Sequence, residues 1–92
     1  MLLARVTIGD FDRFWATFTK AGADHRRAHG SAGARVFRDV DRPTEIVVLF
    51  EWSAEDYRRF MEDPETRRIM AEAGLAGPPE TIELEPVGET GA

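Results

Sequence analysis

The chain has 92 residues, with 12 basic and 17 acidic side chains and a net charge of −5. This length fits one domain with a small core, and the negative charge disfavours nucleic acid as a partner. The absence of cysteine excludes disulfides, thiolate metal ligands and cysteine nucleophiles. We identify no signal peptide and no apolar stretch of membrane-spanning length, so we expect a soluble, cytoplasmic protein with no membrane partner.

The first half of the chain predicts two strands around one helix. Residues 2–8 (LLARVTI) alternate with a period of two, which indicates a strand with one apolar face. Asp10 can cap a long amphipathic helix from residue 11 to about Ala28 or His29, with aromatic side chains at positions 11, 14, 15 and 18. Gly30 is a suitable helix end. Residues 32–40 alternate again and predict the second strand.

The second half predicts a central strand, two helical segments and a last strand. Residues 45–52 (EIVVLFEW) are apolar on both faces, as in a strand covered on both sides. Ser53 can cap a short helix, and Asp63 with Pro64 starts a second helical segment that ends at Gly74. Residues 80–87 predict the last strand. The predicted domain spans residues 1–87, and residues 88–92 form a flexible tail.

The order βαββαβ predicts an α+β, ferredoxin-like fold. Right-handed crossovers then give a four-stranded antiparallel sheet of order 4-1-3-2 with the helices on one face. The other face carries apolar side chains among charged ones: Leu3, Arg5, Arg35, Phe37, Val47, Leu49 and Glu51. Because this surface is too apolar to remain in water, we expect a second copy of the chain to cover it, forming a homodimer.

Four segments resemble the dimeric α/β-barrel superfamily and, within it, the small antibiotic-biosynthesis-monooxygenase-like proteins: DFDRFW, RRAHGSAGARVFRD, PTEIVVLFEW and GPPE. The resemblance implies a homodimer with its two sheets face to face, which is the dimeric α/β barrel, and a small-molecule cavity between helices and sheet. It also implies a cofactor-independent oxygenase that positions, desolvates and deprotonates a hydrophobic aromatic substrate, such as a polyketide or quinol, whose carbanion reacts with dioxygen. No cofactor is expected, and the lack of asparagine disfavours the haem-degrading branch.

Two other functions fit the same resemblance. A polyketide cyclase or isomerase would use the same pocket and base without oxygen. A small-molecule-binding or purely structural dimer would have no catalytic role, in agreement with the absence of side-chain amides and of a tight catalytic motif.

The predicted topology brings His25, His29, Trp52 and Tyr57 to one end of the molecule. The two histidines are four residues apart and share a helix face, so they could bind a metal, contact a substrate or interact with the helix dipole. No third ligand is predictable from the sequence, and we expect no metal. His25 continues the inward stripe of the helix and is the predicted general base.

The remaining candidate residues are aromatic or basic. Trp15, Phe18, Trp52 and Tyr57 are predicted to line a pocket for a flat ligand, with His29 beside them; ordinary core packing is the alternative. Arg38 shares the helix-facing side near the turn at the opposite end from Trp52. It is a candidate contact for an anionic ligand, or it turns outward to solvent.

Overall fold

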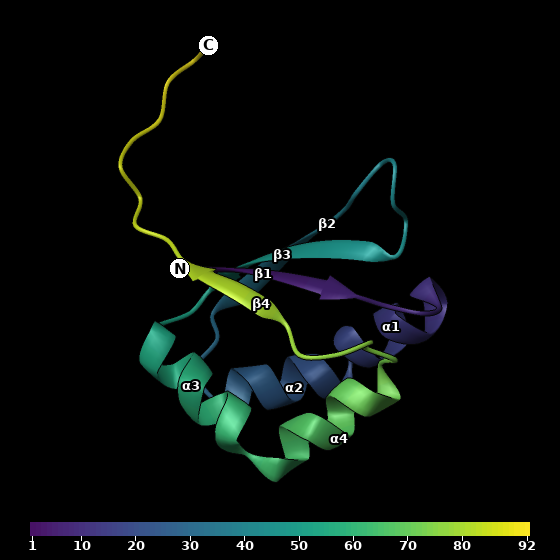
Figure 1. Ribbon diagram of the computed structural model, residues 1–92. Coiled ribbons are helices and arrows are strands. Elements are labelled where there is room, and N and C mark those ends of the chain that lie inside the picture. Colours follow the sequence, from purple (N-terminus) through teal and green to yellow (C-terminus); the bar gives the residue numbers. More distant parts are fainter.

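The computed structural model describes all 92 residues, which form a four-stranded antiparallel sheet with four helices on one face (Figure 1). The strands are β1 (Leu2–Thr7), β2 (Gly33–Arg38), β3 (Glu45–Glu51) and β4 (Glu80–Glu83). The helices are α1 (Phe11–Phe18), α2 (Ala21–Ala28), α3 (Ala54–Glu62) and α4 (Pro64–Glu72). The strand order β2-β3-β1-β4 confirms the predicted ferredoxin-like order 4-1-3-2.

Short polar side chains begin three of the helices, as the sequence predicts. Asp10 accepts a hydrogen bond from the Arg13 N–H at 2.8 Å, and Ser53 accepts one from the Asp56 N–H at 3.1 Å. Asp63 ends α3 and caps α4, and Pro64 occupies the first turn of α4, where no N–H is needed. These caps satisfy amide groups that have no partner inside the helix.

The single helix predicted for residues 11–29 is wrong, because the chain breaks between α1 and α2. Thr19 donates its hydroxyl to the Trp15 carbonyl oxygen at 2.7 Å, and Lys20 leaves the helical conformation with φ −117° and ψ −94°. Side-chain bonds of this kind to the preceding turn bend helices. The break changes which face of α2 points to the sheet.

The last strand is shorter than the predicted range of residues 80–87. It pairs only with β1, where Leu2 lies opposite Glu83. Beyond that pair the Leu84 N–H donates to the Met1 carbonyl oxygen, and β1 offers no further partner. Residues 84–92 therefore carry no strand and extend away from the sheet (Figure 1).

The face of the sheet that carries the helices holds the core. In β3, Ile46, Val48 and Phe50 are buried, and each lies opposite an apolar residue of β1. The helices add Phe14, Phe60 and Ile69 to this layer. The alternation seen in the sequence thus corresponds to one covered face.

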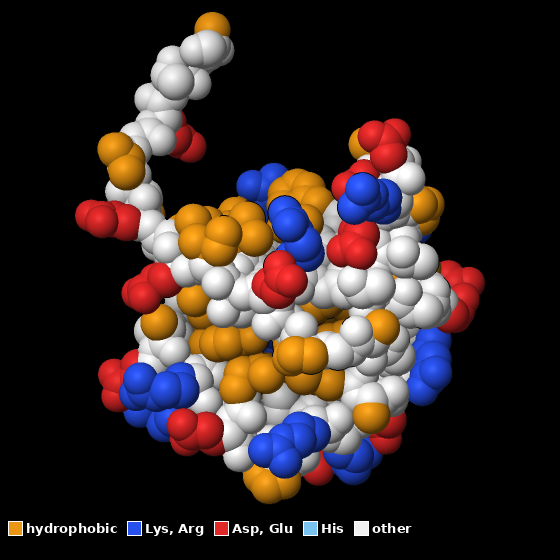
Figure 2. Space-filling model, viewed as in Figure 1, with side chains coloured by type: hydrophobic (Ala, Val, Ile, Leu, Met, Phe, Trp, Pro, Cys, Tyr) orange, Lys and Arg blue, Asp and Glu red, His pale blue; other side chains and the backbone are white.

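No helix covers the opposite face, which we call the open face. One row across the four strands runs Arg35, Leu49, Leu3 and Ile82, and the next runs Phe37, Val47, Arg5 and Glu80. Phe37 is 47% exposed and Ile82 59%. Figure 2 shows hydrophobic side chains at the surface between charged ones on this side of the sheet. None of the four helices combines the length and the apolar character that crossing a bilayer requires.

Candidate functional site

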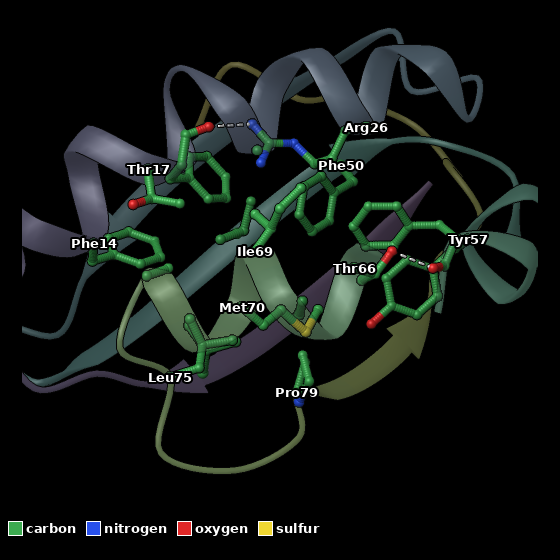
Figure 3. Close-up of a pocket in the computed structure, with 17 residues that line it drawn as sticks. Phe14, Thr17, Arg26, Phe50, Tyr57, Thr66, Ile69, Met70, Leu75 and Pro79 are labelled. Atoms are coloured by element: carbon green, nitrogen blue, oxygen red, sulfur yellow. Dashed lines mark hydrogen bonds between the residues drawn. The ribbon is translucent and has the colours of Figure 1, made fainter. Parts of the chain in front are cut away.

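An apolar cavity lies between the helices and the covered face of the sheet. Its walls come from β1, β3 and all four helices, with Leu75 and Pro79 at the rim, and Figure 3 shows Phe14, Phe50, Ile69 and Met70 around it. The space open to the centre of a water molecule is about 70 Å³. Pockets for drug-sized ligands begin at about 300 Å³, so a larger guest requires half-buried side chains such as Phe18 and Met70 to move.

Arg26 is the only charged residue that lines this cavity. Its guanidinium donates to the Phe18 carbonyl oxygen at 2.9 Å and lies 3.8 Å from the centre of the Phe18 ring. No carboxylate pairs with it in the chain, and burial, together with the charge of Arg27, lowers the pKa of Arg26 to about 10. The cavity therefore contains an unpaired cation that remains charged at neutral pH.

Three residues with side-chain hydroxyls accompany Arg26 on the wall: Thr17, Tyr57 and Thr66. The Tyr57 hydroxyl makes no hydrogen bond within the chain and points into the cavity (Figure 3), and burial raises the pKa of this phenol. Thr66 is buried and donates its hydroxyl to the Phe60 carbonyl oxygen at 2.5 Å. Tyr57 is thus free to donate to a ligand oxygen, whereas the hydroxyl hydrogen of Thr66 is already in use.

Behind Thr66 lies a cluster of His25, His29 and Asp63. The Nε2 atom of His29 is 3.0 Å from Oδ2 of Asp63, and that of His25 is 3.6 Å from the same oxygen. The Glu65 N–H and the hydrogen bond from His29 hold the pKa of Asp63 below its usual value. The carboxylate faces both imidazoles.

His25, the predicted base, does not line the cavity. Its Nε2 atom lies 2.8 Å from the hydroxyl oxygen of Thr66, which stands between the ring and the cavity. Because Thr66 donates its hydrogen to Phe60, the hydrogen of the contact with His25 belongs to the imidazole. As arranged here, that nitrogen donates and does not accept a proton, and the base role of His25 stays a prediction.

The other predicted site residues occupy three places. Phe18 and Tyr57 line the cavity, and Trp52 is buried next to it, where it contacts the Tyr57 ring and donates Nε1–H to the His29 carbonyl oxygen at 3.0 Å. Trp15 is 43% exposed and lines a surface groove between α1, α2 and β2, which shares Phe18 and Arg26 with the cavity. Arg38 lies over the Phe11 ring at 4.7 Å, far from Trp52 along the sheet, and does not line this cavity.

The sequence interpretation missed Arg26, Thr66 and Asp63. Gly22 gave a signal for Arg26, since a Cβ at Gly22 would lie only 3.0 Å from the Arg26 Nη1 atom. Glycine four residues before a long cation leaves room for its head group on the same helix face. For Asp63 the capping role was visible, but its contact with α2 was not.

Sequence comparison finds no family model and no curated protein that matches the chain. Comparison with solved structures finds the fold of the antibiotic biosynthesis monooxygenase proteins, which confirms the suspected resemblance at the level of the fold. A Bordetella bronchiseptica protein assigned to these monooxygenases is similar with a TM-score of 0.77 and 18% identity, over 94% of each chain.

SnoaB, a cofactor-independent oxygenase from Streptomyces nogalater, is similar with a TM-score of 0.70 and 18% identity, over 94% of this chain and 92% of SnoaB. A Chloroflexus aurantiacus protein with the same family assignment has a TM-score of 0.65 and 22% identity, over 98% of this chain and 94% of its own. These structures share with the chain nearly the whole length of the fold.

Proposed function

We propose that the chain binds a hydrophobic, aromatic small molecule with an ionised oxygen in the cavity and oxidises it as a cofactor-independent monooxygenase. The observation that carries this proposal is the unpaired Arg26 guanidinium in an otherwise uncharged, mostly apolar wall. A half-buried cation without a counter-ion favours an anionic guest, such as a phenolate or enolate. The fold shared with SnoaB supports the class of reaction.

The residues on the wall suggest a simple division of roles. Arg26 stabilises the substrate anion and so lowers the pKa of the group that ionises. The Tyr57 hydroxyl donates to a second oxygen, and the aromatic wall excludes water. In the oxidation of a methylene flanked by aromatic rings, the carbon loses two hydrogens and becomes a carbonyl, one atom of dioxygen enters the product, and the other leaves as water.

We propose further that two copies associate through their open faces. The support is the apolar side chains in the two rows across the sheet, where they lie among charged ones, with Phe37 and Ile82 exposed in a single chain. Covering them would add to the small core of a 92-residue domain. The cavity lies on the other side of the sheet, so each copy keeps its own site.

The test uses 1,8-dihydroxyanthrone as the trial substrate, with binding followed by tryptophan fluorescence and turnover by oxygen uptake. Arg26→Met keeps the apolar stem but removes the charge, and we expect at least tenfold weaker binding, about 1.5–3 kcal/mol, with a matching loss of oxygen uptake. Arg27→Met is the matched control, because Arg27 is exposed and pairs with Asp24. Equal oxygen uptake by Arg26→Met and Arg27→Met would overturn the proposal.

The narrowness of the cavity favours a second candidate, a dimer without catalytic function whose own side chains fill this space. The second candidate is supported if the wild-type protein does not convert the trial substrate and if the substrate does not change the tryptophan fluorescence of the protein. Product formed without oxygen uptake would instead indicate a cyclase or isomerase acting in the same pocket.

A further inference from the structure

Three side chains of metal-ligating type meet beside the cavity without lining it. His25 and His29 lie four residues apart on α2, and Asp63 lies at the corner between α3 and α4. One donor atom from each residue can be chosen so that all three lie within 4.8 Å of one another. The helices that supply them are neighbours only in the folded chain.

The spacing of the donor atoms fits a single small ion. A tetrahedral ion with bonds of about 2.0 Å holds its ligand atoms about 3.3 Å apart. The Asp63 Oδ2 atom is 3.0 Å from Nε2 of His29 and 3.6 Å from Nε2 of His25, so the two distances lie on either side of that value. An ion would take the place of the hydrogen on each Nε2 atom, so His25 would exchange its contact with Thr66 for the metal.

The surrounding residues hold the three side chains in place. Both imidazoles pack on the Phe60 ring, with centroid distances of 5.2 Å for His25 and 5.7 Å for His29. The second oxygen of Asp63 accepts the Glu65 N–H at 2.9 Å. Such secondary contacts orient ligands for a metal.

The cluster is also accessible. The side chains of His25, His29 and Asp63 are 13%, 25% and 31% exposed, so an ion can enter from solvent while most of each side chain remains packed. A fourth coordination position stays available for water on the exposed side.

We propose that His25, His29 and Asp63 form a binding site for a divalent transition-metal ion such as Zn²⁺. Two imidazoles and one carboxylate suit the ions that prefer nitrogen with oxygen, whereas Mg²⁺ prefers oxygen alone. The inference goes beyond the proposed function, because Thr66 separates this site from the cavity. It gives His25 the role of a ligand and not that of a proton acceptor.

The experiment measures Zn²⁺ binding to untagged, metal-free protein by calorimetry and repeats it with Co²⁺, whose visible absorption reports the number and type of its ligands. We expect saturable binding of one ion per chain and an absorption spectrum of a site with nitrogen ligands. His29→Ala and Asp63→Asn should each weaken binding at least tenfold. Asparagine still caps a helix, so Asp63→Asn keeps the start of α4.

The control variant is Asp24→Asn, which removes an exposed carboxylate from α2, the helix that carries His25. It should bind Zn²⁺ as the wild type does, and circular dichroism of the metal-free variants should match the wild type. The proposal is overturned if the wild type shows no saturable binding, if Mg²⁺ binds equally well, or if the affinity of Asp63→Asn and His29→Ala equals that of Asp24→Asn. Arg26→Met should retain zinc binding, so failure of the cavity proposal and failure of the metal proposal are distinguishable.

Discussion

The two faces of the sheet contain similar apolar side chains, but only one face is covered within the chain. In β3, Ile46 and Val48 are 0% and 1% exposed under the helices, while Val47 and Leu49 between them remain half-buried on the open face. A strand that is apolar on both sides is typical of a sheet covered on both faces. The helices of the chain cover one face, and we propose that a second copy covers the other.

Substitution of two adjacent valines in β3 is the strongest test of the difference between the covered face and the open face. Val48→Ala should lower the free energy of unfolding by about 2 kcal/mol, because two buried methyl groups are lost from a packed layer. Val47→Ala, on the open face, should lower it by less than about 0.5 kcal/mol in dilute solution. Urea denaturation followed by tryptophan fluorescence measures both, and equal losses would mean that the two faces are equally buried.

The proposed association of open faces is tested by Phe37→Asp. A charge in place of this exposed ring should weaken self-association at least tenfold, about 1.4 kcal/mol. The stability of the separate chain should stay within about 0.5 kcal/mol of the wild type. Analytical ultracentrifugation across a concentration series measures the association. Val40→Asp is the control, because Val40 is also exposed but lies in the β2–β3 turn. Equal weakening of self-association in both variants would contradict the proposal that the open faces form the interface.

On the covered face, Gly22→Ala should disturb the position of Arg26. The added Cβ would lie 3.0 Å from Arg26 Nη1 and 3.0 Å from the Thr17 carbonyl oxygen, so the guanidinium must shift. We expect roughly threefold weaker binding of 1,8-dihydroxyanthrone, about 0.7 kcal/mol. Gly33→Ala meets no atom within 4 Å and is the matched control. If Gly22→Ala binds 1,8-dihydroxyanthrone as tightly as the wild type, the position of the Arg26 guanidinium does not matter for binding.

The smallest effect concerns Tyr57, the single tyrosine of the chain. Burial raises the pKa of Tyr57, so absorbance at alkaline pH should show a higher midpoint for the folded than for the unfolded chain. Because the unfolded phenol loses its proton first, this contribution to stability is complete below the unfolded pKa, about 10, and is lost as pH rises through the folded value. Tyr57→Phe removes the titration and should change stability at neutral pH by less than about 0.5 kcal/mol, since the hydroxyl has no partner.

The order of elements could be predicted because local pattern fixes it. Alternation in residues 2–8 and 45–52, caps at Asp10 and Ser53, and the Asp63-Pro64 pair each indicate an element, and handedness rules then leave one sheet order. The break between α1 and α2 could not be predicted in this way. It depends on the Thr19 bond to Trp15 and on the Arg26 guanidinium, which supplies a donor to Phe18 at the end of α1.

The same break explains why the residues predicted for the site do not all meet at the cavity. For an unbroken helix the inward stripe leads through Gly22 to His25, but in the folded chain Arg26 reaches the cavity while His25 faces α4. The third member of the histidine cluster comes from Asp63, 34 residues further along the chain than His29. Such a meeting depends on how two helices pack, and no local pattern records it.

Asp63 connects the imidazole pair to the orientation of a whole helix. One of its oxygens holds the first turn of α4, and the other faces His29 and His25. Further along α4, Ile69 and Met70 lie in the cavity wall. A change that draws this carboxylate toward the imidazoles should therefore shift α4 and, with it, part of the cavity wall. Ligand affinity and the protonation or metal binding of the two histidines should then change together.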